Sequence, residues 1–394
     1  MYFIATNNLY KLNSSFVVQW QIVHSSTIFD AVVDNANGAI TFVSAQYIMN
    51  LSTSNGSTNW QWFFPTVSYS STFKTVTIDS ANNFWVTYAI LNRSGTPRIG
   101  YTYTVQSGFA RFLSNGSGWG IFGEYNLVTP TKMVVAGITP VFTGSSSSGP
   151  VVNYYNVAGG YMTTSDSNYT NFSNSFISAM CLDSTASNAY IAFNSTSSST
   201  TGYYNSLIMK ASLSSSLGST FQPAYSFTNP ALSPSITAMC TDPSNNLYVL
   251  FYDQITGYYF LTKLNSSFAV QWSNQINYTV LPQLTSIFYH PTFGIVLSGF
   301  EQNSINSNND GLILNVPIDG THNNHSTAVN AGYIYTSYAA SSPTASVYTS
   351  NPSSGNGIGA SGGIASIASS VNFVTSSISN TFGSTGVNCV SVII

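Results

Sequence analysis

A nine-residue segment that occurs twice constrains the fold of this chain more than any other feature. Residues 12–20 read LNSSFVVQW, and residues 264–272 read LNSSFAVQW. Looser copies occupy residues 51–60 (LSTSNGSTNW) and 112–119 (FLSNGSGW). In each copy an apolar strand end is followed by an Asn/Ser/Gly turn and then by a strand that carries a Trp, which is typical of a β-hairpin. The chain is therefore predicted to repeat one structural unit.

A second recurrent element joins two apolar strands through a turn that begins with Asp. It occurs at residues 32–40 (VVDNANGAI), 76–86 (VTIDSANNFWV), 180–184 (MCLDS), 239–249 (MCTDPSNNLYV) and, with His in place of Asp, 288–294 (FYHPTFG). An Asp at the first turn position accepts a hydrogen bond from the backbone two residues on, and the Asn or Gly that follows tolerates positive φ. The same turn is therefore expected in every unit.

The spacing of the turns counts the units. Asp34 and Asp79 are 45 residues apart, Asp183 and Asp242 are 59 apart, and the gap from Asp79 to Asp183 is 104, which leaves room for one degenerate unit at residues 132–142 (KMVVAGITPVF). The two Trp residues of the nine-residue repeat lie 252 positions apart, about five periods, so the N-terminal copy is a unit of its own. Seven units of about fifty residues result, each read as four short antiparallel strands.

Composition supports the same fold class. Charged residues make up 5% of the chain and aromatic residues 14%, whereas exposed helices draw on Glu, Lys, Arg and Ala. We therefore expect an all-β chain, folded as a single β-propeller of about seven four-stranded blades. A parallel β-helix is the main alternative, but its coils are shorter and would not alternate two turn types.

The repeats also define the expected domain organisation. Residues 1–338 are predicted to form the propeller, and residues 339–385, rich in Ser, Gly and Ala, to form a linker or arm. The first unit supplies only three strands of its own. Residues 386–394 (GVNCVSVII) resemble the first strand of other units, so they are predicted to close the first blade.

Charge and hydropathy argue against several classes of partner. A net charge of −3 provides no basic stripe for nucleic acid, and no apolar run is long enough for a membrane helix. The start of the chain lacks the pattern of a secretory signal, so an unprocessed product is expected. Three widely spaced cysteines, Cys181, Cys240 and Cys389, are expected to be free thiols.

The sequence offers few groups for catalysis or metal binding. Most carboxylates are already placed in turns, and no nucleophile or acid–base pair is apparent, so no enzyme and no cofactor are expected. Asn306, Asn308 and Asp310 have oxygen ligands at alternate positions before a Gly, which is similar to a calcium loop, with an ordinary solvated turn as the alternative. Asp319, His322 and His325 are a second candidate, for a transition metal, with surface histidines as the alternative.

Paired tyrosines are the candidate binding residues. They lie near predicted loops or strand ends at Tyr101 and Tyr103, Tyr154 and Tyr155, Tyr203 and Tyr204, and Tyr258 and Tyr259. Such side chains stack on sugar rings or anchor a protein partner, and they also pack between sheets.

Residues 262–272 (TKLNSSFAVQW), after residues 242–249 (DPSNNLYV), resemble the propeller repeats of bacteria and tailed bacteriophages, in which a K-L-N-S-S-G strand pair follows a D-S-x-G-N-x-Y-V hairpin. Phe16 and Phe268 stand where those repeats have Gly. The resemblance implies a non-enzymatic virion protein of the phage tail or its fibres, which contacts other virion proteins and host-surface glycan. The alternative is a secreted or surface-anchored glycan-binding adhesin. The absence of a signal sequence favours location in the virion.

Overall fold

The chain is an all-β protein. In the computed structural model the described residues form strands β1 to β27 and contain no helix, so none that is long and apolar enough to cross a membrane. The structure describes residues 1–5, 7–13, 17–63, 71–96, 100–126, 129–137, 139–146, 149–154, 175–195, 206–213, 221–227, 234–278, 282–302, 309–320, 333–337 and 391–393.

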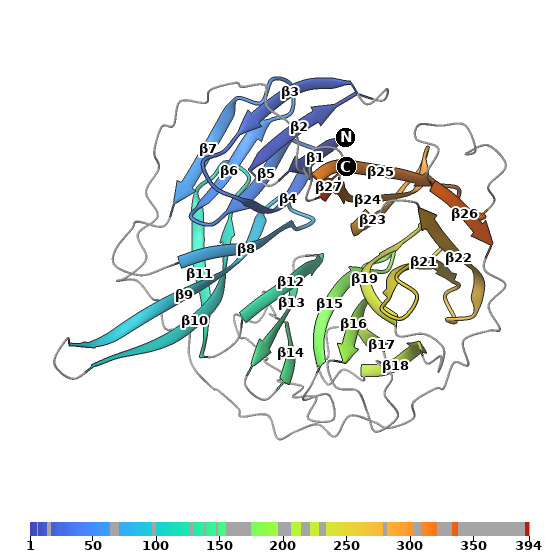
Figure 1. Cartoon of the computed structure of the whole chain (residues 1–394). Coiled ribbons are helices and arrows are strands. Elements are labelled where there is room, and N and C mark those ends of the chain that lie inside the picture. The colour runs from blue at the N-terminus through green and yellow to red at the C-terminus, as the bar shows by residue number, and fades with distance from the viewer. Residues whose placement is uncertain are drawn as a thin grey trace. The chain divides into compact units, whose positions relative to one another are not determined.

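The chain divides into two compact units, and strands β1 to β14 of the first unit lie in four small sheets (Figure 1). Strand β27, of which Ser391 and Val392 belong to the second unit, joins one of these sheets. Their strand orders are β27-β1-β2-β3, β4-β5-β6-β7, β11-β10-β9-β8 and β12-β13-β14. The strands are β1 (Tyr2–Ala5), β2 (Asn8–Leu12), β3 (Val18–Val23), β4 (Ile28–Asp34), β5 (Ala39–Ser44), β6 (Tyr47–Ser52), β7 (Thr58–Phe63), β8 (Ser71–Ile78), β9 (Phe84–Thr96), β10 (Gly100–Phe112), β11 (Gly118–Asn126), β12 (Thr129–Ala136), β13 (Thr139–Ser146), β14 (Gly149–Tyr154) and β27 (Ser391–Ile393).

The second unit contains three sheets, ordered β15-β16-β17-β18, β19-β20-β21-β22-β26 and β23-β24-β25. Their strands are β15 (Ser175–Leu182), β16 (Asn188–Ser195), β17 (Ser206–Ser212), β18 (Phe221–Phe227), β19 (Pro234–Thr241), β20 (Leu247–Asp253), β21 (Tyr259–Leu264), β22 (Val270–Tyr278), β23 (Pro282–His290), β24 (Gly294–Gln302), β25 (Asn309–Val316) and β26 (Tyr333–Ser337). Neighbouring strands pair antiparallel, as in the hairpins predicted from the repeats.

The seven sheets match the seven units predicted from the turn spacing. The expectation of four strands in every unit is wrong for one sheet, because β26 pairs with β22 and makes a fifth strand there. An edge strand presents unpaired backbone groups, so a later segment of the chain can add to it. Two further sheets have three strands in the described part of the chain.

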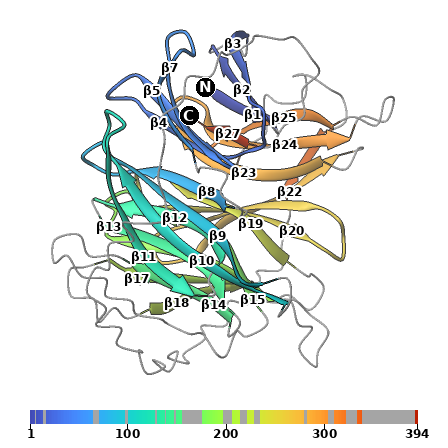
Figure 2. The ribbon, with the colours of Figure 1, turned by 90° about the vertical axis from the view of Figure 1, so that its left-hand side faces the viewer.

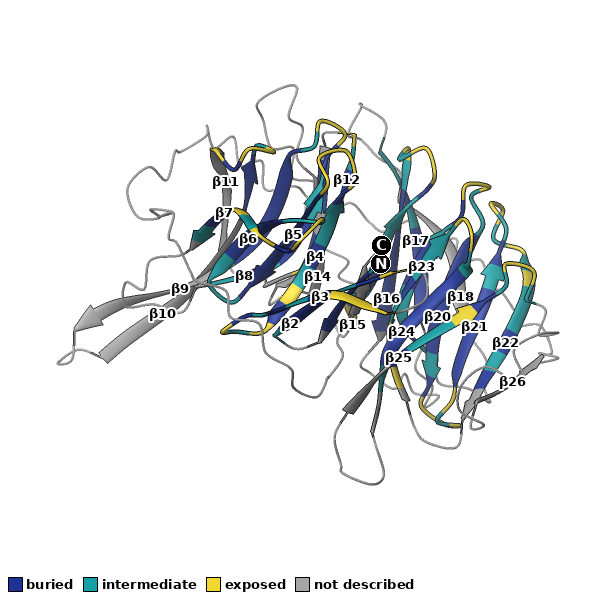
Figure 3. Ribbon diagram, turned by 90° about the horizontal axis from the view of Figure 1, so that it is seen from above, coloured by how far each residue is buried: buried dark blue, intermediate teal, exposed yellow. Residues whose placement is uncertain are grey.

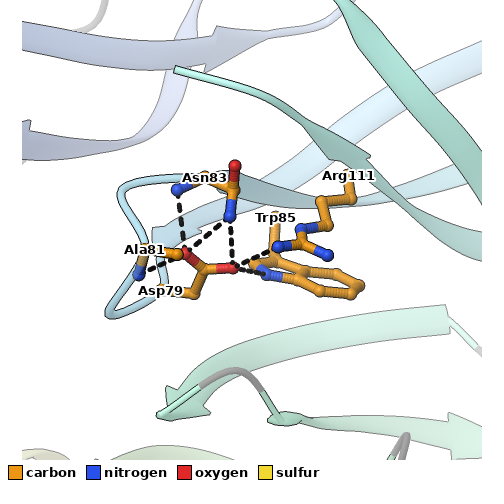
Figure 4. Close-up of polar contacts among 5 residues, drawn as sticks. All are labelled: Asp79, Ala81, Asn83, Trp85 and Arg111. Carbon is orange, nitrogen blue, oxygen red and sulfur yellow. Dashed lines mark hydrogen bonds and ion pairs between the residues drawn. The ribbon is translucent and has the colours of Figure 1, made fainter. Parts of the chain in front are cut away.

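Each predicted Asp turn joins the first and second strands of a sheet, and Figure 4 shows the one at Asp79. Asp79 Oδ1 accepts hydrogen bonds from the backbone N–H groups of Ala81 and Asn83, at 2.9 and 2.8 Å. Asp79 Oδ2 accepts one from Trp85 Nε1 at 3.0 Å and lies 3.3 Å from Arg111 Nη2. The carboxylate therefore replaces the backbone partners that the turn lacks. Related bonds form at Asp34, Asp183 and Asp242.

The residue that needs positive φ in these turns is Asn or Gly in most sheets. Asn82 and Asn245 have φ of 60° and 61°, and Gly38 has 59°. Ala186, in the turn after β15, has φ of 54° without the polar side chain that favours this conformation. The predicted hydrogen bond from the backbone two residues on forms at Asp79 and Asp242, whereas Asp34 and Asp183 accept hydrogen bonds from backbone N–H groups three to five residues on. The prediction of residue type holds in all but one of these turns.

The second type of turn docks neighbouring sheets onto each other. In the first copy of the nine-residue repeat, Lys11 Nζ and Trp20 Nε1 both donate to the carbonyl oxygen of Thr53 in the β6–β7 turn, at 2.7 and 3.2 Å. A Cβ on Gly56 of that turn would lie 3.2 Å from the Trp20 ring. The second copy forms the same contacts through Lys263, Trp272, Ile318 and Gly320. The repeat is therefore conserved within the chain as an inter-sheet joint.

Phe268 occupies the position where the resembling repeats have Gly. Its φ of 60° explains that preference, because glycine alone adopts this conformation without steric cost. The ring of Phe268 lies edge-on to Tyr190 of the adjacent sheet, with centroids 5.7 Å apart. Packing between sheets thus offsets the backbone strain. Phe16 lies outside the described residues.

The first strands of six sheets, β4, β8, β12, β15, β19 and β23, share an irregularity close to their starts. The register shifts by one residue at Phe29, Lys74, Thr131, Ser178, Thr237 and Thr285. Such a bulge bends its strand and increases the local twist. Burial is greatest in the second and third strands, as along β5 and β20, whereas the turns at the strand ends are exposed (Figure 3).

Candidate binding surfaces

The longest hairpin of the described chain extends beyond its own sheet. β9 and β10 pair over their full length, whereas β8 pairs with β9 only as far as Ile90 and β11 pairs with β10 only as far as Gln106. Residues 91–96 and 100–105 therefore pair with each other and with no other described strand. We call these two segments the ribbon; they run past the ends of β8 and β11 and stay side by side (Figure 1 and Figure 2).

The ribbon is continuous with a firmly packed base. Phe73, Phe84, Tyr88 and Phe112 of the same sheet are buried in one cluster with residues of the preceding sheet. A two-stranded hairpin by itself is at best marginally stable in water, so its attachment to this core holds the ribbon in place. An element of this kind can present side chains on two faces and unpaired backbone groups on two edges.

A second candidate is a cluster of charged side chains on the first strands of three sheets. Phe29 and Asp30 belong to β4, Lys74 to β8 and Lys132 to β12, and β8 contacts both of the other strands. The Lys74 ammonium lies 5.4 Å from the centre of the exposed Phe29 ring. These charged residues lie on strands, whereas the carboxylates of the Asp turns lie at strand ends.

Asp30, a titratable residue of β4, also forms a hydrogen bond to the neighbouring sheet. Its Oδ2 accepts a hydrogen bond from the backbone N–H of Val76 at 3.0 Å, and its Oδ1 accepts one from Ala31 at 3.0 Å. Burial raises the pKa of Asp30 to about 6, although these hydrogen bonds and the charge of Lys132 act in the opposite direction. The contacts with β8 are those of a structural carboxylate, and we assign it that role.

The predicted metal sites fall largely outside the described residues. Asn306 and Asn308 lie there, and so do His322 and His325. Asp310 is in β25, opposite Glu301 of β24. Among the residues that the structure describes, no group of three or more His, Cys, Asp or Glu is arranged to hold a metal ion. Calcium at Asn306, Asn308 and Asp310 stays a prediction.

The tyrosine pairs and cysteines are placed in part. Tyr101 and Tyr103 are in the ribbon portion of β10, and Tyr258 is exposed while its neighbour Tyr259 is buried. Tyr154 ends β14, whereas Tyr155, Tyr203, Tyr204 and Cys389 are outside the described residues. Cys181 and Cys240 are free thiols, and burial raises the pKa of both, which suppresses their reactivity.

The sequence matches no protein-family model, and the comparison with curated proteins gives no match. Among solved structures, hydrazine synthase of Kuenenia stuttgartiensis is similar over 79% of this chain and 90% of its own, with 9% identity and a TM-score of 0.47. A functionally unknown protein from Desulfotomaculum acetoxidans is similar over 68% and 77%, with 11% identity and a TM-score of 0.44. At these TM-scores neither likeness carries weight for fold or function.

Sequence reasoning identified Tyr101 and Tyr103 but missed the ribbon that contains them. The signal was present: residues 101–105 (YTYTV) alternate in the period of a strand, with no turn residue among them. The repeat analysis gave no reason to expect it, because four short strands already account for a unit of about fifty residues, whereas β9 and β10 have 13 residues each.

Proposed function

We propose that this chain is a non-enzymatic structural protein of a phage virion, associated with the tail or its fibres, and that it mediates assembly or attachment to the host surface. Its seven sheets are the blades of one β-propeller, which acts as a rigid mount. The ribbon is the contact element. The observation that carries this proposal is the extension of β9 and β10 beyond every described strand that could support them.

The repeated joints between sheets support the role of a rigid mount. Trp20, Trp60 and Trp272 each donate a hydrogen bond from Nε1 to a backbone carbonyl of a turn in a neighbouring sheet, at 3.2, 3.1 and 3.3 Å. The same Trp rings cover positive-φ glycines of those turns. Joints of this kind fix three pairs of neighbouring sheets against each other, and a fixed framework holds a projecting element in one orientation.

The charge distribution supports a non-enzymatic role. Asp79, Asp183 and Asp242 are occupied by hydrogen bonds within their own turns, and Asp30 joins two sheets. These carboxylates are therefore committed to structure and are not available as a general acid or base.

An excised-ribbon variant tests this proposal. Ile90 and Gln106 are cross-strand partners, so a two-residue Asn-Gly turn can join them and remove residues 91–105 while the sheet beneath is retained. Virions that carry the variant should contain the protein at the normal level, as measured by mass spectrometry of purified particles. They should either no longer adsorb to host cells or lack the tail protein that the ribbon contacts. Unchanged adsorption and unchanged assembly would overturn the proposal.

The same preparation of purified particles distinguishes the virion protein from the alternative, a secreted or surface-anchored adhesin. Purified particles should contain the chain if it is a virion protein. An adhesin would instead be found in the cell-surface or culture-medium fraction and be missing from the particles.

A further inference from the structure

The ribbon differs in charge from the chain that carries it. The two ribbon segments, residues 91–96 and 100–105, contain Arg93 and no Asp or Glu. The whole chain has a net charge of −3. A basic extension on a weakly acidic protein favours an anionic partner and disfavours pairing with a second copy of the same ribbon.

The strand register assigns the ribbon residues to two faces. Arg93 is opposite Tyr103, and Gly95 is opposite Tyr101. Because alternate residues of a strand share a face, these four positions lie on one face, together with the pair of Leu91 and Val105. The other face takes the positions of small polar residues, Asn92, Ser94, Thr96, Thr102 and Thr104.

The Arg/Tyr face suits sugar rings that carry negative charge. Tyrosine offers a flat apolar surface with a polar tip, and glycine places no side chain opposite Tyr101. Arginine binds carboxylate or phosphate oxygens through two parallel hydrogen bonds. The backbone groups along the two ribbon edges, which pair with no other described strand, are further partners for sugar hydroxyl groups.

The size of the ribbon favours a linear polymer over a protein as the ligand of this one face. A stable protein interface uses roughly 20–30 residues on each side, more than the whole ribbon provides. Six residues of strand span about 20 Å, which suits a linear polymer that lies along the ribbon. The one arginine of the ribbon segments is too little positive charge for nucleic acid, whose binding depends on neutralising many phosphates.

We propose that the face of the ribbon on which the strand register places Arg93, Tyr101 and Tyr103 binds an anionic polysaccharide. The inference rests on the proposed function, since it names the ligand of the same contact element. The acidic group is a carboxylate or a phosphate, because both fit the arginine.

Binding of the full-length chain to immobilised polysaccharides tests this inference. The probes are polygalacturonate for the carboxylate, a polyglycerol-phosphate teichoic acid for the phosphate, and dextran as a neutral polymer. One acidic polymer should bind, dextran should not, and binding should weaken as NaCl rises from 50 to 200 mM. Equal binding of dextran, or preference for a DNA duplex over both acidic polymers, would overturn the inference.

Matched variants locate the site. Arg93→Gln and Tyr103→Ala should weaken binding by at least about tenfold, since each removes a contact on the proposed face. Thr102→Ala, a change on the other face of the same strand, should leave binding unchanged. An equal loss in all three would contradict the assignment. Circular dichroism and thermal unfolding of each variant check that the sheet has folded.

The two proposals fail in different ways. If the wild-type chain binds neither acidic polymer while the excised-ribbon variant still abolishes adsorption or assembly, the ligand assignment is wrong and the proposed function stands. If the excised-ribbon variant attaches and assembles as the wild type does, the proposed function is wrong whatever the polymers bind.

Discussion

Aspartate side chains organise this protein in two different ways. In the turns, as at Asp79 and Asp183, the carboxylate accepts hydrogen bonds from backbone and side-chain groups of the same turn. At Asp30 the carboxylate instead bonds to the backbone of the next sheet. The two kinds of Asp therefore differ in what sets their contribution to stability. In the turns it depends on the number of hydrogen bonds and ion pairs that the carboxylate forms, and at Asp30 it depends on whether the carboxylate is protonated.

Asp79→Asn should destabilise the fold more than Asp183→Asn. Asp79 and its ion-pair partner Arg111 are both buried, so loss of the negative charge removes the carboxylate that this buried guanidinium faces, at a cost of about 3–5 kcal/mol. Asp183 has hydrogen-bond partners but no ion pair among the described residues, and its replacement should cost about 1–3 kcal/mol. Urea unfolding of both variants measures the difference. Equal losses would show that the ion pair adds nothing to the turn.

Asp30→Asn should change how stability depends on pH. Because the pKa of Asp30 is raised to about 6, the folded protein retains a proton that the unfolded chain releases, so its contribution to stability is present at low pH and lost as pH rises through 6. Between pH 4 and pH 7 the free energy of unfolding of the variant should therefore rise relative to that of the wild type, by no more than about 3 kcal/mol. Urea midpoints at several pH values measure this gain; a constant difference would mean that Asp30 titrates normally.

At the scale of elements, the joints between sheets depend on glycines beneath tryptophan rings. A Cβ on Gly116 would lie 2.5 Å from Trp60 Cγ, whereas a Cβ on Gly137 would have no neighbour within 4 Å. Both glycines have positive φ, of 83° and 62°. A comparison of substitutions at the two positions therefore distinguishes the cost of backbone strain from the cost of displacing the Trp ring.

Gly116→Ala should be more destabilising than Gly137→Ala by at least about 1 kcal/mol. Both variants incur the strain of positive φ, about 1–2 kcal/mol, and only the first also displaces a tryptophan. Thermal unfolding, with near-ultraviolet circular dichroism to report the Trp environment, measures the effect. If the two variants lose the same stability, the Trp joint contributes little.

The sequence predicted the elements that repeat and missed those that do not. The Asp turns and Trp hairpins were recognisable because each depends on local chemistry, such as the carboxylate of Asp242 within its own turn. The joint between Trp272 and the carbonyl of Ile318 joins residues 46 positions apart, and no local pattern reports it. The fifth strand β26 and the ribbon occur once each, so periodicity gave no signal for either.

At the scale of the whole molecule, the first sheet contains strands from both ends of the chain. β27 is placed next to β1 in the order β27-β1-β2-β3. A strand from one end that adds to a sheet from the other closes a long loop without a covalent bond, and it covers the edge that β1 would otherwise expose. The stability of the proposed ring should depend on this short strand.

Deletion of residues 386–394 should lower the melting temperature and promote aggregation, because the edge of β1 becomes available to other chains. A chain that lacks only residue 394 keeps β27 and serves as the control. Differential scanning calorimetry with light scattering measures both effects. A truncated protein that is monomeric and as stable as the control would show that β27 does not stabilise the first sheet.

A crystal structure of the full-length chain is the most direct test of the proposed rigid propeller mount. The account predicts seven sheets arranged around one axis, with the ribbon projecting from its sheet in one orientation in every copy of the molecule. Sheets that do not share one axis, or a ribbon folded back against its own sheet, would contradict the account.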